Sequence, residues 1–342
     1  MGNAFTNHAI EDRSYVSYIK REIHSAAVKA KFSGLKVGEI DIVVSEITSN
    51  LVKHAGSGAL LYRVNTTDAM PAIELISIDS GPGMADTAKM IKDGESTTQT
   101  LGQGLGAIHR LSETAQVYSR PGWGTIVYSV IQEKKNKEEN NVLLPKGTAL
   151  VSVHALCVPK PREVECGDGY CVRQRRSGLM VFFADGLGHG PQAKEAVAAA
   201  SEIFMTCEEI DPVDIIRKLH DSIRRTRGLV GTVTVFDSKA NEFRFCGVGN
   251  IHSRFYTGIE SKNFMSYNGT VGMNIPNTIN ASGAALEKNQ HLILCSDGIQ
   301  TRWDLARYPG IFKFNPMVLA ASIYKDFNRG NDDASVLIVK VS

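Results

Sequence analysis

Apolar residues recur every three or four positions in two stretches near the start of the chain, 14–32 and 37–54. This spacing predicts two amphipathic helices. Apolar runs at 59–65 and 72–79 then predict two strands. Residues 81–102 are rich in Gly, Ser and Thr and are expected to form a long loop. A short helix at 104–113 and a hairpin of strands at 115–120 and 124–132 complete the pattern.

The remainder of the chain has many strand-like runs and few helical ones. Helical spacing occurs at 192–207, 212–225 and 316–327. Many strands with few helices are typical of layered sheets covered by helices, so the fold class is predicted to be α+β. The strands are predicted at 148–158, 179–185, 230–237, 242–250, 252–258, 291–297 and 334–341.

One run of ten residues, QEKKNKEENN at 132–141, contains no apolar residue and is followed by Pro145 and Gly147. Such a stretch is typical of a solvated linker. The chain of 342 residues is also longer than a single hydrophobic core usually serves. We therefore predict two domains, at 1–132 and 148–342, joined by a linker at 133–147.

Composition excludes some classes of function. The net charge of +2 is close to neutral, which argues against a general affinity for nucleic acid or for an acidic membrane surface. No apolar segment approaches the roughly 20 residues of a membrane helix, and no signal peptide is visible. The six cysteines are scattered, and Cys166 and Cys171 lack the spacing and the nearby His of a zinc site. We expect a cytoplasmic protein with reduced thiols, and its oligomeric state stays open.

The second predicted helix carries Glu46, Asn50 and His54 at intervals of four residues. In an α-helix of about 3.6 residues per turn these side chains share one face. They suit a Mg²⁺-bound polyphosphate, because an amide oxygen can bind the metal while an acid orients water or accepts a proton. Taken alone, the motif is explained as well by a solvated polar face.

Two glycine-containing motifs follow the predicted strand at 72–79. In the first, an aspartate at the strand end can accept a hydrogen bond from an adenine amino group, and the glycines after it let a planar base come close. In the second, three glycines open a predicted helix whose free backbone N–H groups can hold phosphate. An ordinary turn explains either motif alone. The motifs consist of Asp79, Gly81 and Gly83, and of Gly102, Gly104 and Gly106.

In this order, SEITSNLVKHAG, IDSGPGMAD and LGQGLGAIHRL resemble the N-box, DxGxG and GxGLG motifs of the GHKL ATPase superfamily. The segment between the last two is similar to that of the small anti-sigma-factor and stressosome serine kinases. The resemblance covers 13–132 and implies an α/β sandwich of the Bergerat fold that binds ATP with Mg²⁺. It gives no role to His54. The roles that it implies are catalytic base for Glu46, Mg²⁺ ligand for Asn50, adenine site for Asp79, Gly81, Gly83 and Thr125, and phosphate site for Gly104 and Gly106.

Four aspartates of the second predicted domain lie at strand ends or tight turns. One such residue is usually a cap or turn residue. Two of the four, however, share one setting, an apolar strand that ends in Asp-Gly (VFFADGLGHG and LILCSDGIQ). Carboxylates brought together at strand ends repel each other unless cations such as Mg²⁺ or Mn²⁺ neutralise them, and the glycines are expected to let metal, water and phosphate approach the backbone. The four are Asp168, Asp185, Asp297 and Asp332.

This pattern resembles the type 2C (PPM) metal-dependent serine/threonine phosphatases, and within them the bacterial branch of the sporulation stage II E and stressosome phosphatases. The likeness spans 148–341 through GD at 167–168, ADGLGHG at 184–190, GVGN at 247–250, SDG at 296–298 and DDAS at 332–335. It implies a β-sandwich flanked by helices, with a site for two Mg²⁺ or Mn²⁺ ions. The implied metal ligands are Asp168, Asp185, Asp297 and Asp332, with the backbone carbonyl of Gly186.

Three details of this domain qualify the resemblance. Asp333 takes the place of the asparagine that is common in eukaryotic members. The arginine that contacts phosphate in many eukaryotic members has no clear counterpart here. His189 fits equally well as an acid near the leaving group and as a structural residue at the start of a helix.

The leading hypothesis is a metal-dependent phosphoserine/phosphothreonine protein phosphatase fused to an ATP-binding serine kinase-like domain that acts in bacterial partner-switching signalling. The resemblance implies a STAS-domain phosphoprotein as partner, and neither nucleic acid nor membrane. In a second hypothesis, the N-terminal domain is a nucleotide-dependent docking module without kinase activity. In a third, the second domain hydrolyses a small-molecule phosphate and the first senses nucleotide.

Overall fold

The chain divides into two compact units, and its computed structural model describes residues 4–66, 70–87, 104–133, 151–175, 178–258 and 260–342. What we call the N-terminal unit consists of Phe5–Val142 and Tyr308–Ser322. The C-terminal unit consists of Met1–Ala4, Leu143–Arg307 and Ile323–Ser342. Of the linker expected at 133–147, only Glu133 lies within the described residues. None of the described helices is both long enough and apolar enough to cross a membrane.

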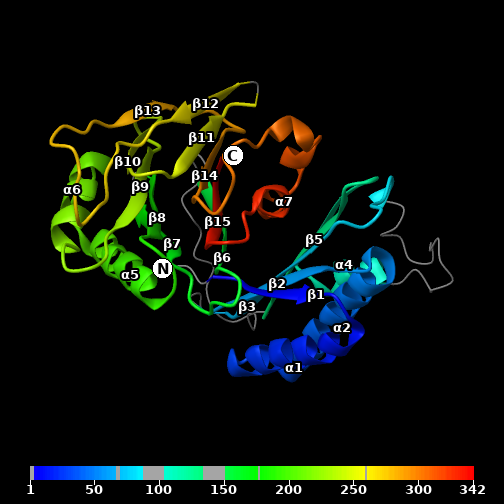
Figure 1. The fold of residues 1–342 in the computed structure, drawn as a ribbon. Coiled ribbons are helices and arrows are strands. Elements are labelled where there is room, and N and C mark those ends of the chain that lie inside the picture. The colour runs from blue at the N-terminus through cyan, green and yellow to red at the C-terminus, as the bar shows by residue number, and fades with distance from the viewer. Residues whose placement is uncertain (1–3, 67–69, 88–103, 134–150, 176–177, 259) are drawn as a thin grey trace, which may run out of the picture. The chain divides into compact units, whose positions relative to one another are not determined.

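The N-terminal unit contains one antiparallel sheet of five strands in the order β1-β2-β3-β5-β4. Helices α1 and α2 cover one face of it (Figure 1), and a single apolar core that includes Ile23, Val44 and Leu75 lies between them. The elements are β1 (Thr6–Ile10), α1 (Arg13–Lys29), α2 (Gly34–Asn50), η1 (Leu51–Ala55), β2 (Gly58–Asn65), β3 (Ala72–Asp79), α4 (Gly104–Leu111), β4 (Thr114–Arg120) and β5 (Gly124–Gln132).

Polar residues fix the starts of the two long helices. Asp12 caps α1, because its Oδ1 accepts a hydrogen bond from the Ser14 N–H at 2.5 Å. Ser33 caps α2 and also donates its own N–H to Glu133 Oε2 at 2.7 Å. These caps satisfy N–H groups that have no partner inside a helix. The cap at Ser33 starts α2 at Gly34, three residues before the predicted start at Val37.

Two features of the N-terminal unit differ from the prediction. Strand β1, with the sequence TNHAI, has too few apolar residues to show a strand pattern, and it forms at the sheet edge through its register with β2. The second helix is not α-helical as far as His54: at Leu51 it becomes a π-helix that ends at Ala55. A π-turn has more residues per turn, so His54 leaves the face that Glu46 and Asn50 share.

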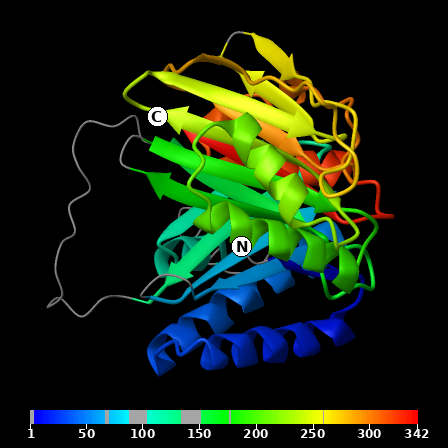
Figure 2. The ribbon, with the colours of Figure 1, turned by 90° about the vertical axis from the view of Figure 1, so that its left-hand side faces the viewer.

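The C-terminal unit is a sandwich of two antiparallel five-stranded sheets, in the orders β13-β10-β9-β8-β7 and β12-β11-β14-β15-β6 (Figure 2). The first sheet comprises β7 (Asp168–Arg175), β8 (Gly178–Gly186), β9 (Leu229–Asp237), β10 (Glu242–Val248) and β13 (Ser282–Ala285). The second comprises β6 (Val151–Val158), β11 (His252–Tyr256), β12 (Ser261–Phe264), β14 (His291–Cys295) and β15 (Ala334–Val341).

Two apolar cores stabilise this unit, one on each face of the first sheet. Phe183 and Leu294 belong to the core between the sheets, whereas Phe182 and Phe204 belong to the core under helices α5 (Pro191–Thr206) and α6 (Pro212–Ser222). Consecutive residues of a strand point to opposite faces, so β8 is buried on both sides and reads as one continuous apolar run. The predicted α+β fold class, with a helix-flanked β-sandwich in the second part, is confirmed.

Short helical elements follow β14, namely η2 (Leu305–Arg307), η3 (Ile311–Lys313) and α7 (Pro316–Phe327), of which α7 matches its predicted bounds. Strands β7, β12 and β13 were not predicted. The sequence of β7, DGYCVRQR, begins with a charge and ends in polar residues, and β12 and β13 are short and largely exposed. These are edge strands, which sequence patterns indicate poorly because half of their surface is solvated.

Candidate functional site

Two of the four expected metal ligands lie opposite each other on neighbouring strands. Asp168 is the first residue of β7 and Asp185 is the second-to-last residue of β8, and the antiparallel register pairs them directly. A cross-strand pair places Cβ atoms about 4.5–5.5 Å apart, a distance at which two ionised carboxylates repel each other. The sheet therefore holds two acids together that would separate in water.

Residues from the second sheet join this pair. Ser296, which follows β14, donates its hydroxyl hydrogen bond to Asp168 Oδ2 at 2.7 Å and accepts one from the Ser335 N–H at 2.9 Å. The next residue, Asp297, is exposed and accepts a hydrogen bond on Oδ2 from Asn250 Nδ2 at 3.1 Å. Strand ends of both sheets thus meet at one edge of the sandwich.

Asp332 and Asp333, which precede β15, have different surroundings. Asp333 is buried, and its two carboxylate oxygens accept hydrogen bonds from the Lys160 N–H at 2.7 Å and the Gly167 N–H at 2.8 Å. Asp332 is half-buried, and its Oδ1 accepts the N–H of Asp333 at 2.9 Å. Asp333 therefore anchors the loop before β7, while Asp332 keeps free coordination capacity, as expected for the ligand of the two.

The electrostatics of this carboxylate cluster, which we define as Asp168, Asp185, Asp297, Asp332 and Asp333, favour a bound cation. Burial, together with the charges of Asp333 and Asp297, raises the pKa of Asp168 to about 7. Burial, followed by the charges of the other four acids, also raises the pKa of Asp185. The Oδ1 atom of Asp168 is buried and has no hydrogen-bond partner in the described part of the chain.

A divalent cation would remove this repulsion and give the buried oxygen a ligand, so the donor set fits Mg²⁺ or Mn²⁺. Among the described residues, no three His, Cys, Asp or Glu side chains already have the geometry of a formed metal site. Since carboxylates without their cation repel each other, the metal is expected to draw them together on binding.

Gly186, the expected carbonyl ligand, is required for a reason that the sequence did not show. A Cβ atom at this position would lie 2.3 Å from the Ala193 carbonyl oxygen, in the first turn of α5. Its N–H donates to the Gly167 carbonyl at 3.1 Å. The glycine thus serves the close approach of α5 and of the loop before β7, rather than open space for metal and phosphate.

His189 lies after this turn, immediately before α5. Its Nδ1 is 3.1 Å from Glu163 Oε1, and both side chains are partly exposed. The positive charge that His189 can carry lowers the pKa of Asp333, although burial keeps that pKa above its usual value overall. His189 is thus near the carboxylate cluster and already has a carboxylate partner.

In the N-terminal unit, the expected adenine-site residues surround the end of β3. Asp79 Oδ1 accepts hydrogen bonds from the Gly81 N–H at 2.9 Å and the Thr125 N–H at 3.1 Å. The Thr125 hydroxyl lies 2.8 Å from Ser119 Oγ, which also accepts from the Met84 N–H at 2.8 Å. Ser119 was missed from the sequence because nothing distinguishes it from an ordinary strand serine.

The backbone at this turn leaves no room for larger residues. Gly124 has a φ of +113°, and a Cβ atom there would lie 2.1 Å from the Asp79 carbonyl oxygen. A Cβ atom at Gly83 would lie 1.9 Å from the Arg120 carbonyl oxygen. The β4–β5 turn and the segment after β3 are therefore pressed together, which positions Asp79 and Thr125.

The expected phosphate and metal residues also come together. A Cβ atom at Gly104 would lie 2.7 Å from Glu46 Oε2 and 3.7 Å from Asn50 Oδ1. Both acid and amide side chains of α2 thus face the first residue of α4, whose N-terminal N–H groups can hold phosphate. Gly106 is buried in α4, and Gly102 lies outside the described residues.

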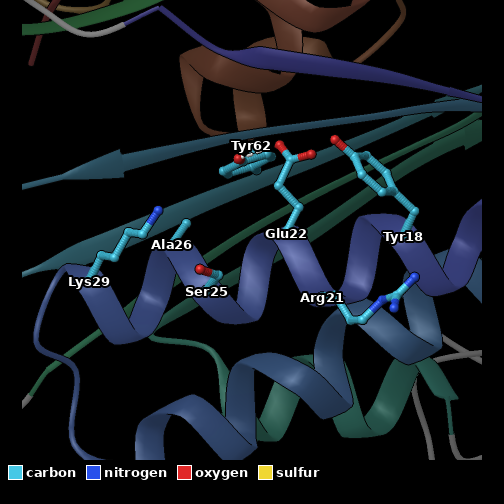
Figure 3. Close-up of a pocket in the computed structure, with 7 residues that line it drawn as sticks. All are labelled: Tyr18, Arg21, Glu22, Ser25, Ala26, Lys29 and Tyr62. Carbon is cyan, nitrogen blue, oxygen red and sulfur yellow. Dashed lines mark hydrogen bonds between the residues drawn. The ribbon is translucent and has the colours of Figure 1, made fainter.

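A separate hollow of about 540 Å³ lies along α1 and β2 (Figure 3). In it, Glu22 Oε1 accepts a hydrogen bond from the Tyr62 hydroxyl at 2.7 Å and lies 3.1 Å from His8 Nε2. Partial burial alone would raise the pKa of Glu22, but the bonds from Tyr62 and Tyr18 and the charge of His8 lower it. These bonds attach α1 to the sheet. The lining residues are Tyr18, Arg21, Glu22, Ser25, Ala26, Lys29 and Tyr62, none of them an expected site residue.

Comparison with known proteins agrees with this division of the chain. Residues 11–130 match the histidine kinase-like ATPase domain family. Residues 175–342 match the stage II sporulation protein E family. The first match contains the Asp79 and Glu46 regions and the second contains most of the carboxylate cluster, although Asp168 precedes it.

Two characterised proteins of Bacillus subtilis (strain 168) are similar to parts of the chain. The serine/threonine-protein kinase RsbT is 28% identical over 106 residues, which cover 31% of this chain and 80% of RsbT. The phosphoserine phosphatase RsbX is 28% identical over 86 residues, which cover 25% of this chain and 43% of RsbX.

Solved structures support the fold. A chain from the structure described as "The bacterial stressosome: a modular system that has been adapted to control secondary messenger signaling" aligns with a TM-score of 0.52 and 24% identity, over 56% of this chain and all of that one. RsbX, solved in complex with magnesium, aligns with a TM-score of 0.50 and 19% identity, over 67% of this chain and all of that one. The chain therefore joins a histidine kinase-like ATPase domain of the GHKL type to a stage II sporulation protein E domain, which is a phosphatase domain of the PPM type.

Proposed function

We propose that the chain is a metal-dependent phosphoserine/phosphothreonine protein phosphatase whose ATPase-like domain binds ATP and phosphorylates a partner protein. The observation that carries the phosphatase proposal is the carboxylate cluster. Asp168 and Asp185 are paired across two strands, their pKa values are raised by burial and by neighbouring acids, and one buried oxygen lacks a partner among the described residues. A stable fold keeps such a cluster only where a cation compensates for it.

Asp168, Asp185, Asp297 and Asp332 would hold two Mg²⁺ or Mn²⁺ ions, with the Gly186 carbonyl as a further oxygen ligand. Such ions lower the pKa of bound water and neutralise charge on phosphate oxygens. The protein keeps the ligands in place through the Ser296 hydroxyl on Asp168 and the Asn250 amide on Asp297. Asp333 holds the loop before β7, and so acts on the site through Asp168.

The ATPase-like domain would bind ATP with Mg²⁺ between Asp79 and the start of α4. Asp79 and Thr125 would read adenine, Asn50 would bind Mg²⁺, and the N–H groups at Gly104 and Gly106 would hold phosphate. Glu46 would accept the proton of the partner's serine hydroxyl, since its Oε2 faces Gly104. Gly102 belongs to the same proposed site, and His54 has no part in it.

The proposed substrate of both activities is a STAS-domain phosphoprotein in partner-switching signalling. RsbT is a kinase and RsbX a phosphoserine phosphatase of one bacterium, and this chain resembles each in a different half. Phosphorylation adds roughly −1.5 to −2 charges and can open or block an interface. Two opposing activities on one chain would set the phosphorylation level of such a partner. We place the protein in the cytoplasm on this basis.

Removing the metal tests the phosphatase proposal. The purified full chain is expected to release phosphate from a phosphoserine peptide with Mn²⁺ and to lose this activity in excess chelator. Adding back Mn²⁺ should restore the rate, because the fold does not depend on the ions. Equal hydrolysis with and without chelator would show that the carboxylate cluster is not a metal site for hydrolysis.

Replacing Asp79 with Asn tests the adenine site. The amide keeps an acceptor oxygen for the Gly81 and Thr125 N–H groups but loses the charge that strengthens a bond to the adenine amino group. We expect calorimetric affinity for ATP to fall about ten- to hundredfold. Asp41→Asn, on the exposed side of α2, is the matched control and should bind ATP like the unchanged chain. Unaltered affinity of the Asp79 variant would place adenine elsewhere.

A further inference from the structure

Arg227 lies against the turn that follows Asp185, although the two are 42 residues apart in the sequence. The β8–β9 register pairs Asp185 with Val230 and Gly186 with Leu229. Beyond the last pair, the Leu187 N–H donates to the Gly228 carbonyl at 3.1 Å. One step further, a Cβ atom at Gly188 would lie 3.1 Å from Arg227 Nη1. The ladder therefore continues past the strand end and brings this guanidinium to the rim of the carboxylate cluster.

The charge of Arg227 is available to a ligand. Its side chain is exposed, and the ion pairs of the described residues do not include it. Two neighbouring cations differ in this respect, since Arg224 pairs with Asp221 at 2.8 Å and Lys194 pairs with Glu165. Gly188 itself has a φ of +85°, so the turn under the guanidinium has a backbone that L-residues rarely adopt.

The cluster needs such a cation for its substrate. Five ionised carboxylates and two divalent ions leave the site close to neutral, with a net charge of −1. A phosphoserine brings roughly −1.5 to −2 further charges. An exposed guanidinium offers two parallel N–H donors to a phosphate, which a single ammonium group does not.

We propose that Arg227 binds the phosphate of the substrate, and so supplies the cation for which the sequence motifs gave no counterpart. The inference rests on the proposed phosphatase function and adds a residue to that site. It assigns to the β8–β9 ladder a second role, since the same register that places Asp185 also places the phosphate anchor three residues beyond it.

The test measures phosphate binding separately from metal binding. With the full chain, Mn²⁺ and a phosphoserine peptide, Arg227→Gln is expected to raise both KM and the inhibition constant of inorganic phosphate by roughly ten- to hundredfold. Arg227→Lys should give an intermediate rise, because it keeps the charge and loses the fork. The Mn²⁺ concentration for half-maximal activity should stay within about twofold. Arg224→Gln, the matched control, should leave all three values unchanged.

The outcomes separate the two proposals. If the unchanged chain releases no phosphate with Mn²⁺, the proposed function fails and the inference fails with it. If the chain is active but Arg227→Gln leaves the phosphate inhibition constant unaltered, only the inference is overturned. The same holds if the Mn²⁺ requirement rises in step with that constant, since Arg227 would then act through the metal site. Arg329, whose N–H donates to the Gly298 carbonyl at 2.9 Å, is the competing cation, and an effect of Arg329→Gln without one of Arg227→Gln would also overturn it.

Discussion

Replacing Asp185 with Asn is expected to reduce Mn²⁺-dependent phosphate release from a phosphoserine peptide by at least about 100-fold. Changes to groups that only support a metal ligand already cost about 10- to 100-fold, and Asp185 is proposed as a direct ligand. The amide has a similar shape, so the β7–β8 pair should persist. Removing one charge also relieves repulsion with Asp168, and the variant should therefore unfold at the same or a higher temperature without metal.

Asp221→Asn is the matched control, since Asp221 is an exposed aspartate that pairs with Arg224 on the same unit. Its rate and its Mn²⁺ requirement should equal those of the unchanged chain. A fully active Asp185→Asn variant would remove Asp185 from the metal site and, with it, the basis for assigning the other ligands.

Replacing Glu46 with Gln is expected to reduce transfer of phosphate from ATP to a STAS-domain protein by about 10²- to 10⁴-fold, the usual contribution of a general base. The Glu46 carboxylate faces the start of α4 beside Asn50, where the proposed polyphosphate would lie. Glutamine keeps the size and hydrogen bonding of the side chain but cannot take the proton. ATP affinity should consequently change little while transfer is lost.

Radiolabel from γ-labelled ATP measures this transfer, and Asp41→Asn on the same helix serves as the control. A Glu46→Gln variant that still labels the partner would remove Glu46 from the role of base. If the unchanged chain labels nothing while ATP alters its affinity for the partner, the ATPase-like domain is a docking module instead.

Motifs at the ends of strongly apolar elements were predictable from the sequence. Asp79 and Asp185 end buried strands, β3 and β8, whose continuous apolar runs fix both the strand and its last residues. Glu46 and Asn50 share a helix face because their spacing matches the helical repeat. In these places local pattern and tertiary packing favour the same structure, so the sequence alone is sufficient.

Relations that depend on pairing between distant segments were not predictable. The partnership of Asp168 with Asp185 follows from the register of β7, an edge strand with little apolar pattern. The hydrogen bond from Ser296 to Asp168 crosses between the two sheets. The departure of His54 comes from a π-helix that no spacing rule indicates. Such features are set by tertiary context, which overrides local propensity.

The central claim is that this chain both adds and removes phosphate on one partner. Its most direct test is the phosphorylated fraction of a STAS-domain protein, measured by mass spectrometry at steady state with ATP, Mg²⁺ and Mn²⁺. We expect an intermediate fraction with the unchanged chain, nearly complete phosphorylation with Asp185→Asn, and almost none with Glu46→Gln. The same phosphorylated fraction with all three proteins would contradict the claim.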